Sequence, residues 1–238
     1  MNICKKCNSE FEGNYCPNCG HPQKLERING HYILSEITSV LNFQKGILFT
    51  IKELLLRPGQ NIKVFISEDR NRLVKPILFV LITSLIYAIS VKTFHFRDGY
   101  FNFNIDDLQG SSLGIIFQWI KNHYGYFNII MAVFIAIWIK IFFRKFNYNY
   151  YEILVLLCFI MGVEMLLLSL LGMIDSLTEL KILKSSAIIY YFYGVWAIGQ
   201  FFGKKKIINY VKGFLSYLLG MLTCVFILMG IGRLIDLI

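Results

Sequence analysis

Long runs of uncharged, apolar residues constrain the fold of this chain more than any other feature. From Pro76 to Val91 no residue is charged, and similar runs recur through the rest of the sequence. A helix needs about 20 mostly apolar residues to cross the hydrocarbon of a bilayer. Charged residues make up only 16% of the chain, against roughly 25% in ordinary soluble domains. The sequence therefore predicts an all-α polytopic membrane protein.

Five of these runs are near the length of a membrane span, and together they form a predicted bundle over residues 76–238. Their expected bounds are Leu73–Val91, Tyr124–Phe143, Ile153–Ile174, Ser185–Phe202 and Val211–Gly232. Glycines are frequent in the last three runs, and small residues permit close helix approach in lipid. This is compatible with a compact bundle and with a homo-oligomer.

The distribution of Lys and Arg predicts an orientation. Residues 1–75 hold eleven of them, and further clusters lie at Arg144-Lys145 and Lys204–Lys206. The alternate loops, 92–123 and 175–184, are poorer in basic residues and contain acidic ones. The positive-inside rule then places the N-terminus in the cytoplasm and the C-terminus outside. Lipid headgroups account for the formal charge of +9, so nucleic acid is a disfavoured partner.

Two cysteine pairs lie in the first nineteen residues, Cys4-x2-Cys7 and Cys16-x2-Cys19. Two such pairs complete a tetrahedral Zn²⁺ site, and four sulfur ligands leave no open position for catalytic water. The alternative is disulfide pairing, which a reducing cytoplasm disfavours. We therefore expect a structural zinc ribbon over residues 1–30, folded by its metal because so short a segment cannot bury a core.

Residues 31–75 form an amphipathic segment between the ribbon and the bundle. Helical spacing of apolar residues occurs at Ile33–Leu41, at Ile47–Leu55 and at Ile62–Ile66. Glu53 and Arg57 are expected to form an i,i+4 pair. Two arrangements remain open: helices lying on the cytoplasmic face of the membrane, or a small soluble helical domain.

Several stretches of the first half together resemble a known family. They are CKKCNSEFEGNYCPNCG, RINGHYILSEI and KGILFTIKELLLRPGQNIKVFI, followed by Lys75-Pro76 before the first span. Over about residues 1–95 the chain resembles DUF3667, a family of bacterial membrane proteins of unknown function found mainly in Bacteroidota. The resemblance implies a zinc ribbon and the bacterial inner membrane, and it implies no activity. Its motif supplies Arg57, Pro58, Gly59, Lys75 and Pro76 as candidate residues where the chain enters the membrane.

One ionisable residue, Glu164, lies about midway along the third predicted span. Charge at that depth is costly, so the side chain is expected to face the bundle interior, to be protonated or to be paired. It is either a proton relay or cation site, or a neutral group hydrogen-bonded to a neighbouring helix through Tyr193 or Thr223. Loop 92–123 is expected to be an ordinary interfacial loop with aromatic anchors.

The sequence contains no nucleophile elbow, phosphate loop or HExxH motif. The favoured function is therefore a non-enzymatic scaffold or regulatory membrane protein whose ribbon docks a cytosolic partner. A small transporter or channel using Glu164 is the first alternative, and a lipid-modifying membrane enzyme is the second.

Overall fold

The computed structural model describes residues 2–4, 7, 9–19, 46–96, 112–122, 124–178 and 183–236. The chain forms two compact units, Met1–Leu41 and Asn42–Ile238. The helix predicted at Ile33–Leu41 and the central part of loop 92–123 lie outside the described residues.

The first unit is a small β-hairpin with a cysteine cluster. Strand β1 (Asn2–Ile3) pairs antiparallel with β2 (Glu10–Phe11), with Asn2 opposite Phe11. The backbone N–H of Cys4 donates to the Ser9 carbonyl at 2.9 Å and closes the hairpin. Among the described residues, the buried hydrophobic cluster of this unit consists of Cys4, Phe11 and Cys16. One aromatic ring and two thiols bury too little surface to fold the unit without further help.

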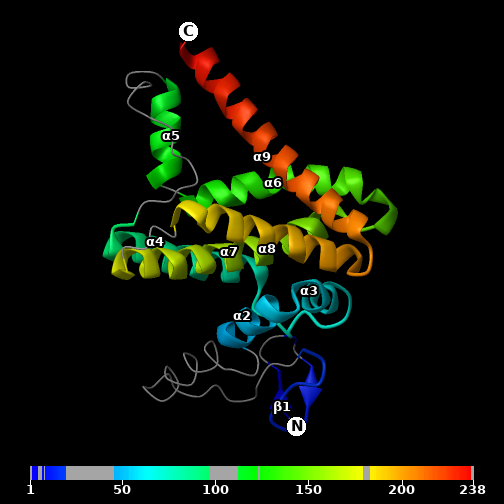
Figure 1. The fold of residues 1–238 in the computed structure, drawn as a ribbon. Helices are drawn as coiled ribbons and strands as arrows, with labels where there is room; N and C mark the ends of the chain where they lie inside the picture. Colours follow the sequence, from blue (N-terminus) through cyan, green and yellow to red (C-terminus); the bar gives the residue numbers. More distant parts are fainter. Residues whose placement is uncertain are drawn as a thin grey trace. The chain divides into compact units, whose positions relative to one another are not determined.

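The second unit is helical (Figure 1). Its described elements are α2 (Ile47–Leu56), α3 (Pro58–Ser67), α4 (Pro76–Phe94), α5 (Ser112–Asn122), α6 (Tyr124–Phe142), the 3-10 turn η3 (Arg144–Phe146), α7 (Tyr150–Thr178), α8 (Leu183–Gly203) and α9 (Ile207–Asp236). A helix therefore occupies each of the five predicted runs. The prediction of a mostly helical chain with an N-terminal cysteine cluster is confirmed.

Helix α7 lies at the centre of the second unit. It packs against α4, α6 and α8, and also against α2 and α3. The Phe159 ring of α7 lies 5.1 Å from the ring of Phe65 in α3 and 5.9 Å from that of Phe79 in α4. Since α7 is apolar on all sides, burial on every face is its most stable arrangement.

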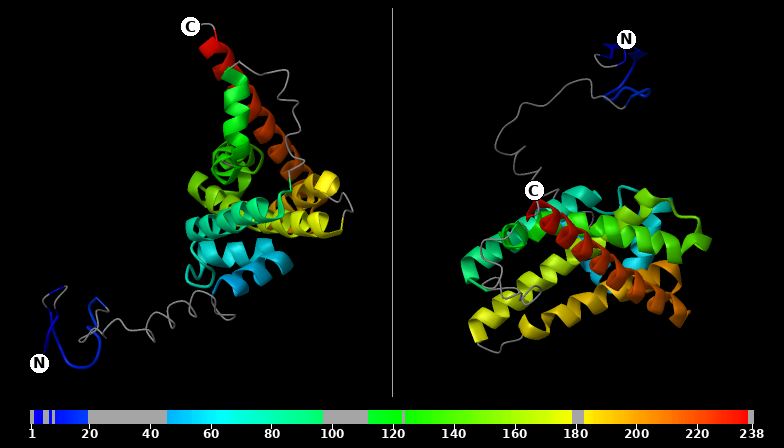
Figure 2. Two further views of the ribbon diagram at one scale, coloured as in Figure 1. Left: turned by 90° about the vertical axis from the view of Figure 1, so that its left-hand side faces the viewer. Right: turned by 90° about the horizontal axis from the view of Figure 1, so that it is seen from above.

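The helices of this unit are arranged in layers (Figures 1 and 2). Helices α4, α7 and α8 run side by side, with α2 and α3 against one side of them. Helices α6 and α9 lie on the opposite side, and the C-terminal part of α9 projects outward with α5 beside it. The α2–α3 pair thus belongs to the same helical unit as the predicted spans.

Three described helices, α4, α7 and α9, are long and apolar enough to cross a membrane, and α6 has a shorter apolar part, Tyr126–Phe142. The outward faces are also apolar. Ile77 of α4 is 73% exposed, Phe192 of α8 is 69% exposed and Ile207 of α9 is 79% exposed. Apolar exposure of this extent is typical of a surface that meets lipid or protein rather than water.

Helix α5 is a difference from the sequence prediction, which treated residues 92–123 as a loop. The Asp236 carboxylate at the end of α9 accepts the backbone N–H of Ser112 at 2.8 Å and so caps the first turn of α5. Phe117 and Ile120 of α5 are buried. The helix depends on a partner from the far end of the chain, which local sequence cannot reveal.

Candidate metal centre and buried carboxyl group

The four cysteines of the first unit converge on one point. The sulfur atoms of Cys4, Cys7, Cys16 and Cys19 all lie within 4.8 Å of one another. The Cys4–Cys19 and Cys7–Cys16 sulfur pairs are 3.5 and 3.6 Å apart. Sulfurs held about 2.3 Å from a tetrahedral zinc ion are roughly 3.8 Å from each other. The described sulfurs therefore fit around a single metal ion, and all four cysteines are free thiols.

Ser9 lowers the pKa of two of these thiols. Its hydroxyl oxygen lies 2.9 Å from the sulfur of Cys7 and 3.2 Å from that of Cys16. Hydrogen bonding to Ser9 is the largest cause that lowers the pKa of the Cys7 thiol, to about 6, and it also lowers the pKa of the Cys16 thiol. Because the thiolate is the metal-binding form of cysteine, both shifts favour metal binding.

The Arg57-Pro58-Gly59 turn joins α2 to α3 and creates an unusual hydrogen-bonding need. Pro58 is the first residue of α3 and has no backbone N–H. The carbonyl of Leu54, four residues earlier, therefore lacks the donor that a continuing helix would supply. The hydroxyl of Tyr193 in α8 donates to this carbonyl at 3.1 Å. The amide of Asn61 also donates to the Glu53 carbonyl at 3.0 Å.

Gly59 allows α3 to approach α8 closely. A Cβ atom at this position would lie 2.4 Å from the backbone carbon of Gln200 and the backbone nitrogen of Phe201. Only glycine fits so near another backbone. The contact fixes α3 to α8, and α2 also packs on α7, so both helices belong to the helical bundle.

Lys75 and Pro76 mark the beginning of α4. Lys75 is the N-cap residue and Pro76 the first helical residue, where the missing N–H of proline costs nothing. The ammonium group of Lys75 donates to Asn71 Oδ1 at 3.2 Å. Just before it, the N–H of Val74 donates to the hydroxyl of Thr50 in α2 at 3.0 Å. The start of α4 is thus tied to α2.

The predicted Glu53–Arg57 pair is wrong. Glu53 instead forms a salt bridge with Arg72, with 3.5 Å between Oε2 and Nη2. Arg57 is the C-cap residue of α2 and has non-helical backbone angles, φ −144° and ψ 60°, so its side chain does not leave the helix as that of a helical residue would.

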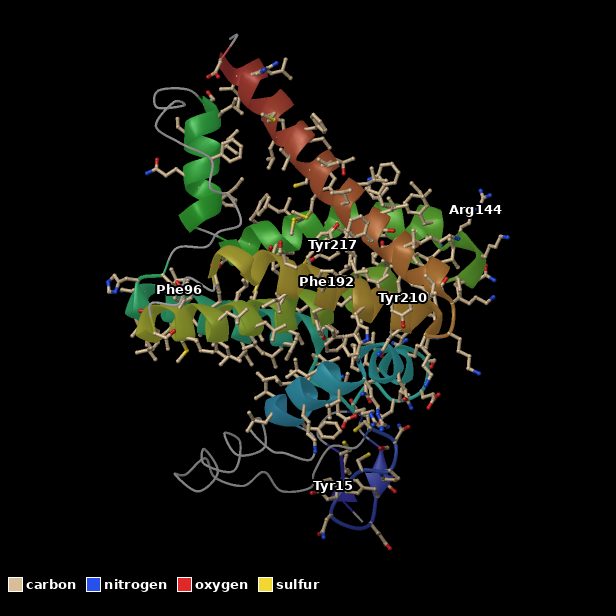
Figure 3. The ribbon with its side chains drawn as sticks, in the orientation of Figure 1. Tyr15, Phe96, Arg144, Phe192, Tyr210 and Tyr217 are labelled. Atoms are coloured by element: carbon tan, nitrogen blue, oxygen red, sulfur yellow. The ribbon has the colours of Figure 1, made fainter. Side chains whose placement is uncertain are left out.

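Glu164 lies in the interior of the second unit, on α7, and is 5% exposed. The hydroxyl of Tyr217 in α9 donates to Glu164 Oε2 at 2.7 Å. Gly194 of α8 makes room for this pair, because a Cβ there would lie 2.5 Å from Glu164 Oε1. Figure 3 shows Tyr217 among the central helices. Glu164 therefore points inward, as expected, and its contacts connect α7 with α8 and α9.

The predicted partners of Glu164 are both incorrect. Tyr193 donates to the Leu54 carbonyl, and the hydroxyl of Thr223 donates within its own helix, to Leu219. Tyr217 had one sequence signal, since it lies in an apolar run between two glycines that allow neighbouring helices to approach. Among the described residues, Glu164 Oε1 has no hydrogen-bond partner. Burying a neutral carboxyl group in these surroundings costs less free energy than burying a carboxylate.

Comparisons with known proteins identify one segment of the chain. No curated protein and no solved structure matches the chain. A family model does match one segment, which covers α2, α3 and most of α4 and begins after the cysteine cluster. This segment includes the Arg57-Pro58-Gly59 turn and Lys75-Pro76. Residues 44–88 match the family DUF3667, described as a protein of unknown function, which confirms the family resemblance over this segment.

Proposed function

We propose that this protein is a non-enzymatic scaffold or regulatory protein of a bacterial inner membrane, whose cytoplasmic zinc ribbon binds a protein partner. The convergence of four thiols carries the proposal, together with the fact that Phe11 is the other buried hydrophobic residue in the part of this unit that the structure describes. A closed Cys4 site has no position for a substrate, so the metal serves to hold a surface in shape.

The surface of the ribbon supports a docking role. Ile3 and Tyr15 are 67% and 68% exposed, although both are large hydrophobic residues. Exposed apolar side chains on so small a unit are typical of a contact surface, and tyrosine is favoured in protein interfaces. Zinc binding would fix the strand and the turn that carry them.

The membrane part of the proposal rests on apolar helices and basic loops. Five spans, with the N-terminus inside, would place Arg144, Lys145 and Lys204–Lys206 on the same side of the membrane as the ribbon. The apolar outward faces of α4, α8 and α9 support contact with lipid.

Crosslinking followed by pull-down from native membranes tests the docking role. Variant C16S/C19S removes two zinc ligands, and variant I3S/Y15S keeps all four ligands while removing the apolar surface. We expect both to lose the partner captured by the wild type, and C158S to retain it, because Cys158 lies in α7. Unchanged capture by I3S/Y15S, with zinc still bound, would exclude this surface.

The transporter alternative depends on Glu164, and the observation in its favour is that Oε1 has no hydrogen-bond partner in the part of the chain that the structure describes. The enclosed position of the side chain against Gly194 and Tyr217 favours a structural role. Purified protein in liposomes, loaded with a pH-sensitive dye, would distinguish the two. A proton flux that Glu164→Gln abolishes would establish transport, whereas we expect no flux in either protein.

A further inference from the structure

A wide, open hollow lies where α3, η3 and the turn between α8 and α9 meet. It has a volume of about 1110 Å³. Its basic lining residues are Arg57, Lys63, Lys204, Lys205 and Lys206. Figure 3 shows this end of the bundle, which carries Arg144 and Tyr210, as the end opposite Phe96. Glu164 is not among its lining residues.

The charge in the hollow is unbalanced. Five cations line it, together with one acidic residue, Glu68. Within the described ranges, none of these cations forms a salt bridge, since the Arg72–Glu53 pair lies elsewhere. Cations that line one hollow with too few counter-charges repel one another and attract anions. Such a site is most stable when it holds a negatively charged ligand.

Tight packing of α3 on α8 brings Arg57 and Lys63 together with the three lysines that follow α8. Gly59 allows the start of α3 to touch the backbone of Gln200, which sets Arg57 beside the lysines that follow α8. Gly203 ends α8 with a φ of 142°, a conformation that favours glycine. Its carbonyl accepts hydrogen bonds from the N–H of Lys206 and the amide of Asn209, which fixes the turn.

The chemistry of these groups selects phosphate among anions. A guanidinium group binds phosphate oxygens through two parallel hydrogen bonds, and lysine ammonium groups add point charges. Gln60 and Gln200 also line the hollow and offer amide donors. We propose that this hollow binds the phosphate group of an anionic ligand, with Arg57 and Lys204–Lys206 as its main contacts.

The apolar part of the lining favours a phospholipid headgroup as the source of that phosphate. Phe146, Phe202 and Val64 line the hollow together with the cations. A phospholipid presents a charged phosphate next to an apolar chain, which matches this mixed lining. Basic pockets between helices on the cytoplasmic side are a known form of lipid site. This choice of source rests on the proposed membrane location, whereas the phosphate site itself does not.

Native mass spectrometry of the full-length protein in neutral detergent tests the proposal. The probes are phosphatidylglycerol, phosphatidylcholine and, as a free phosphate, pyrophosphate. We expect phosphatidylglycerol to bind in preference to phosphatidylcholine. Variant K204Q/K205Q/K206Q should bind it about a hundredfold more weakly, since each of the three basic residues near an anionic headgroup contributes roughly fivefold. The control K52Q/K92Q/R233Q removes equal charge outside the hollow and should bind as the wild type does.

Each outcome decides between defined alternatives. Saturation by pyrophosphate without lipid would support the phosphate site and assign it to a soluble ligand, even if the membrane location failed. Equal binding of the two lipids, with no binding of pyrophosphate, would overturn the proposal. Equal losses in the two triple variants would also overturn it, because net charge rather than the hollow would then explain binding.

Discussion

The two units of this protein are stabilised by different interactions. The first has a buried cluster of Cys4, Phe11 and Cys16, whereas the second buries a continuous set of aliphatic and aromatic side chains around α7. In the first, the fold depends on the geometry of a few thiols. In the second, it depends on the fit between helices. The proposed metal would take the place that a hydrophobic core has in the second unit, and only a small unit can be held together in this way.

Metal removal should produce the largest difference between the two units. Structural zinc sites contribute on the order of 10 kcal/mol to the folding of small domains. We expect a zinc chelator, or variant C16S/C19S, to make residues 1–41 sensitive to protease while residues 46–236 retain their helices. Proteolysis followed by intact-mass measurement, with circular dichroism, would check this. Full protection of the first unit from protease in the absence of metal would show that this unit does not need a metal to fold.

Gly59→Ala should give the largest effect of a single substitution in the second unit. The added methyl group would meet the backbone of Gln200 at 2.4 Å, and backbone cannot move aside as a side chain can. Overpacking of this kind costs about 1–3 kcal/mol or more. Thermal unfolding in detergent would measure it. Gly230→Ala is the matched control, because a Cβ there meets no atom within 4 Å, and it should leave stability unchanged or slightly higher.

Tyr217→Phe should have a smaller effect than Gly59→Ala. It removes the hydroxyl that donates to Glu164 and leaves a buried carboxyl group without that donor. An unsatisfied buried polar group costs about 1–3 kcal/mol. The same unfolding measurement applies, with Tyr151→Phe as control because Tyr151 is 76% exposed. Equal stability of the two variants would indicate that water replaces the lost hydroxyl.

Glu53→Gln should have the smallest effect. The Arg72–Glu53 pair is 3.5 Å long and partly exposed to solvent, and pairs of this kind contribute at most about 1 kcal/mol. We expect a slightly lower unfolding temperature at low salt and no difference at high salt, because salt screens exposed charges. A large loss would mean that this pair holds α2 in place more firmly than its geometry indicates.

Sequence periodicity predicted α4, α6, α7, α8 and α9 because each is long and locally apolar, whereas it missed α5. The predicted run Ile153–Ile174 lies within α7, and Val211–Gly232 lies within α9. The spacing of the two CxxC pairs was also enough to predict that the four cysteines lie close together, since two such pairs in a short hairpin have few other arrangements. The number of membrane spans and their orientation remain predictions.

Contacts between distant segments could not be predicted in the same way. The cap that Asp236 gives to α5, the Tyr217–Glu164 hydrogen bond and the Tyr193–Leu54 hydrogen bond all join residues far apart in the sequence. The basic hollow is a further case. Lys204–Lys206 was interpreted as a topology signal and Arg57 as part of a motif, and only the packing at Gly59 shows that they are neighbours.

The turn at Pro58 has an evolutionary consequence. Its ring removes an amide hydrogen, and the hydroxyl of Tyr193 supplies the missing donor from another helix. The two positions should therefore vary together among related chains. Where a relative keeps the proline, we expect a side chain with a donor at the position of Tyr193; where the proline is replaced, phenylalanine or leucine should become acceptable there.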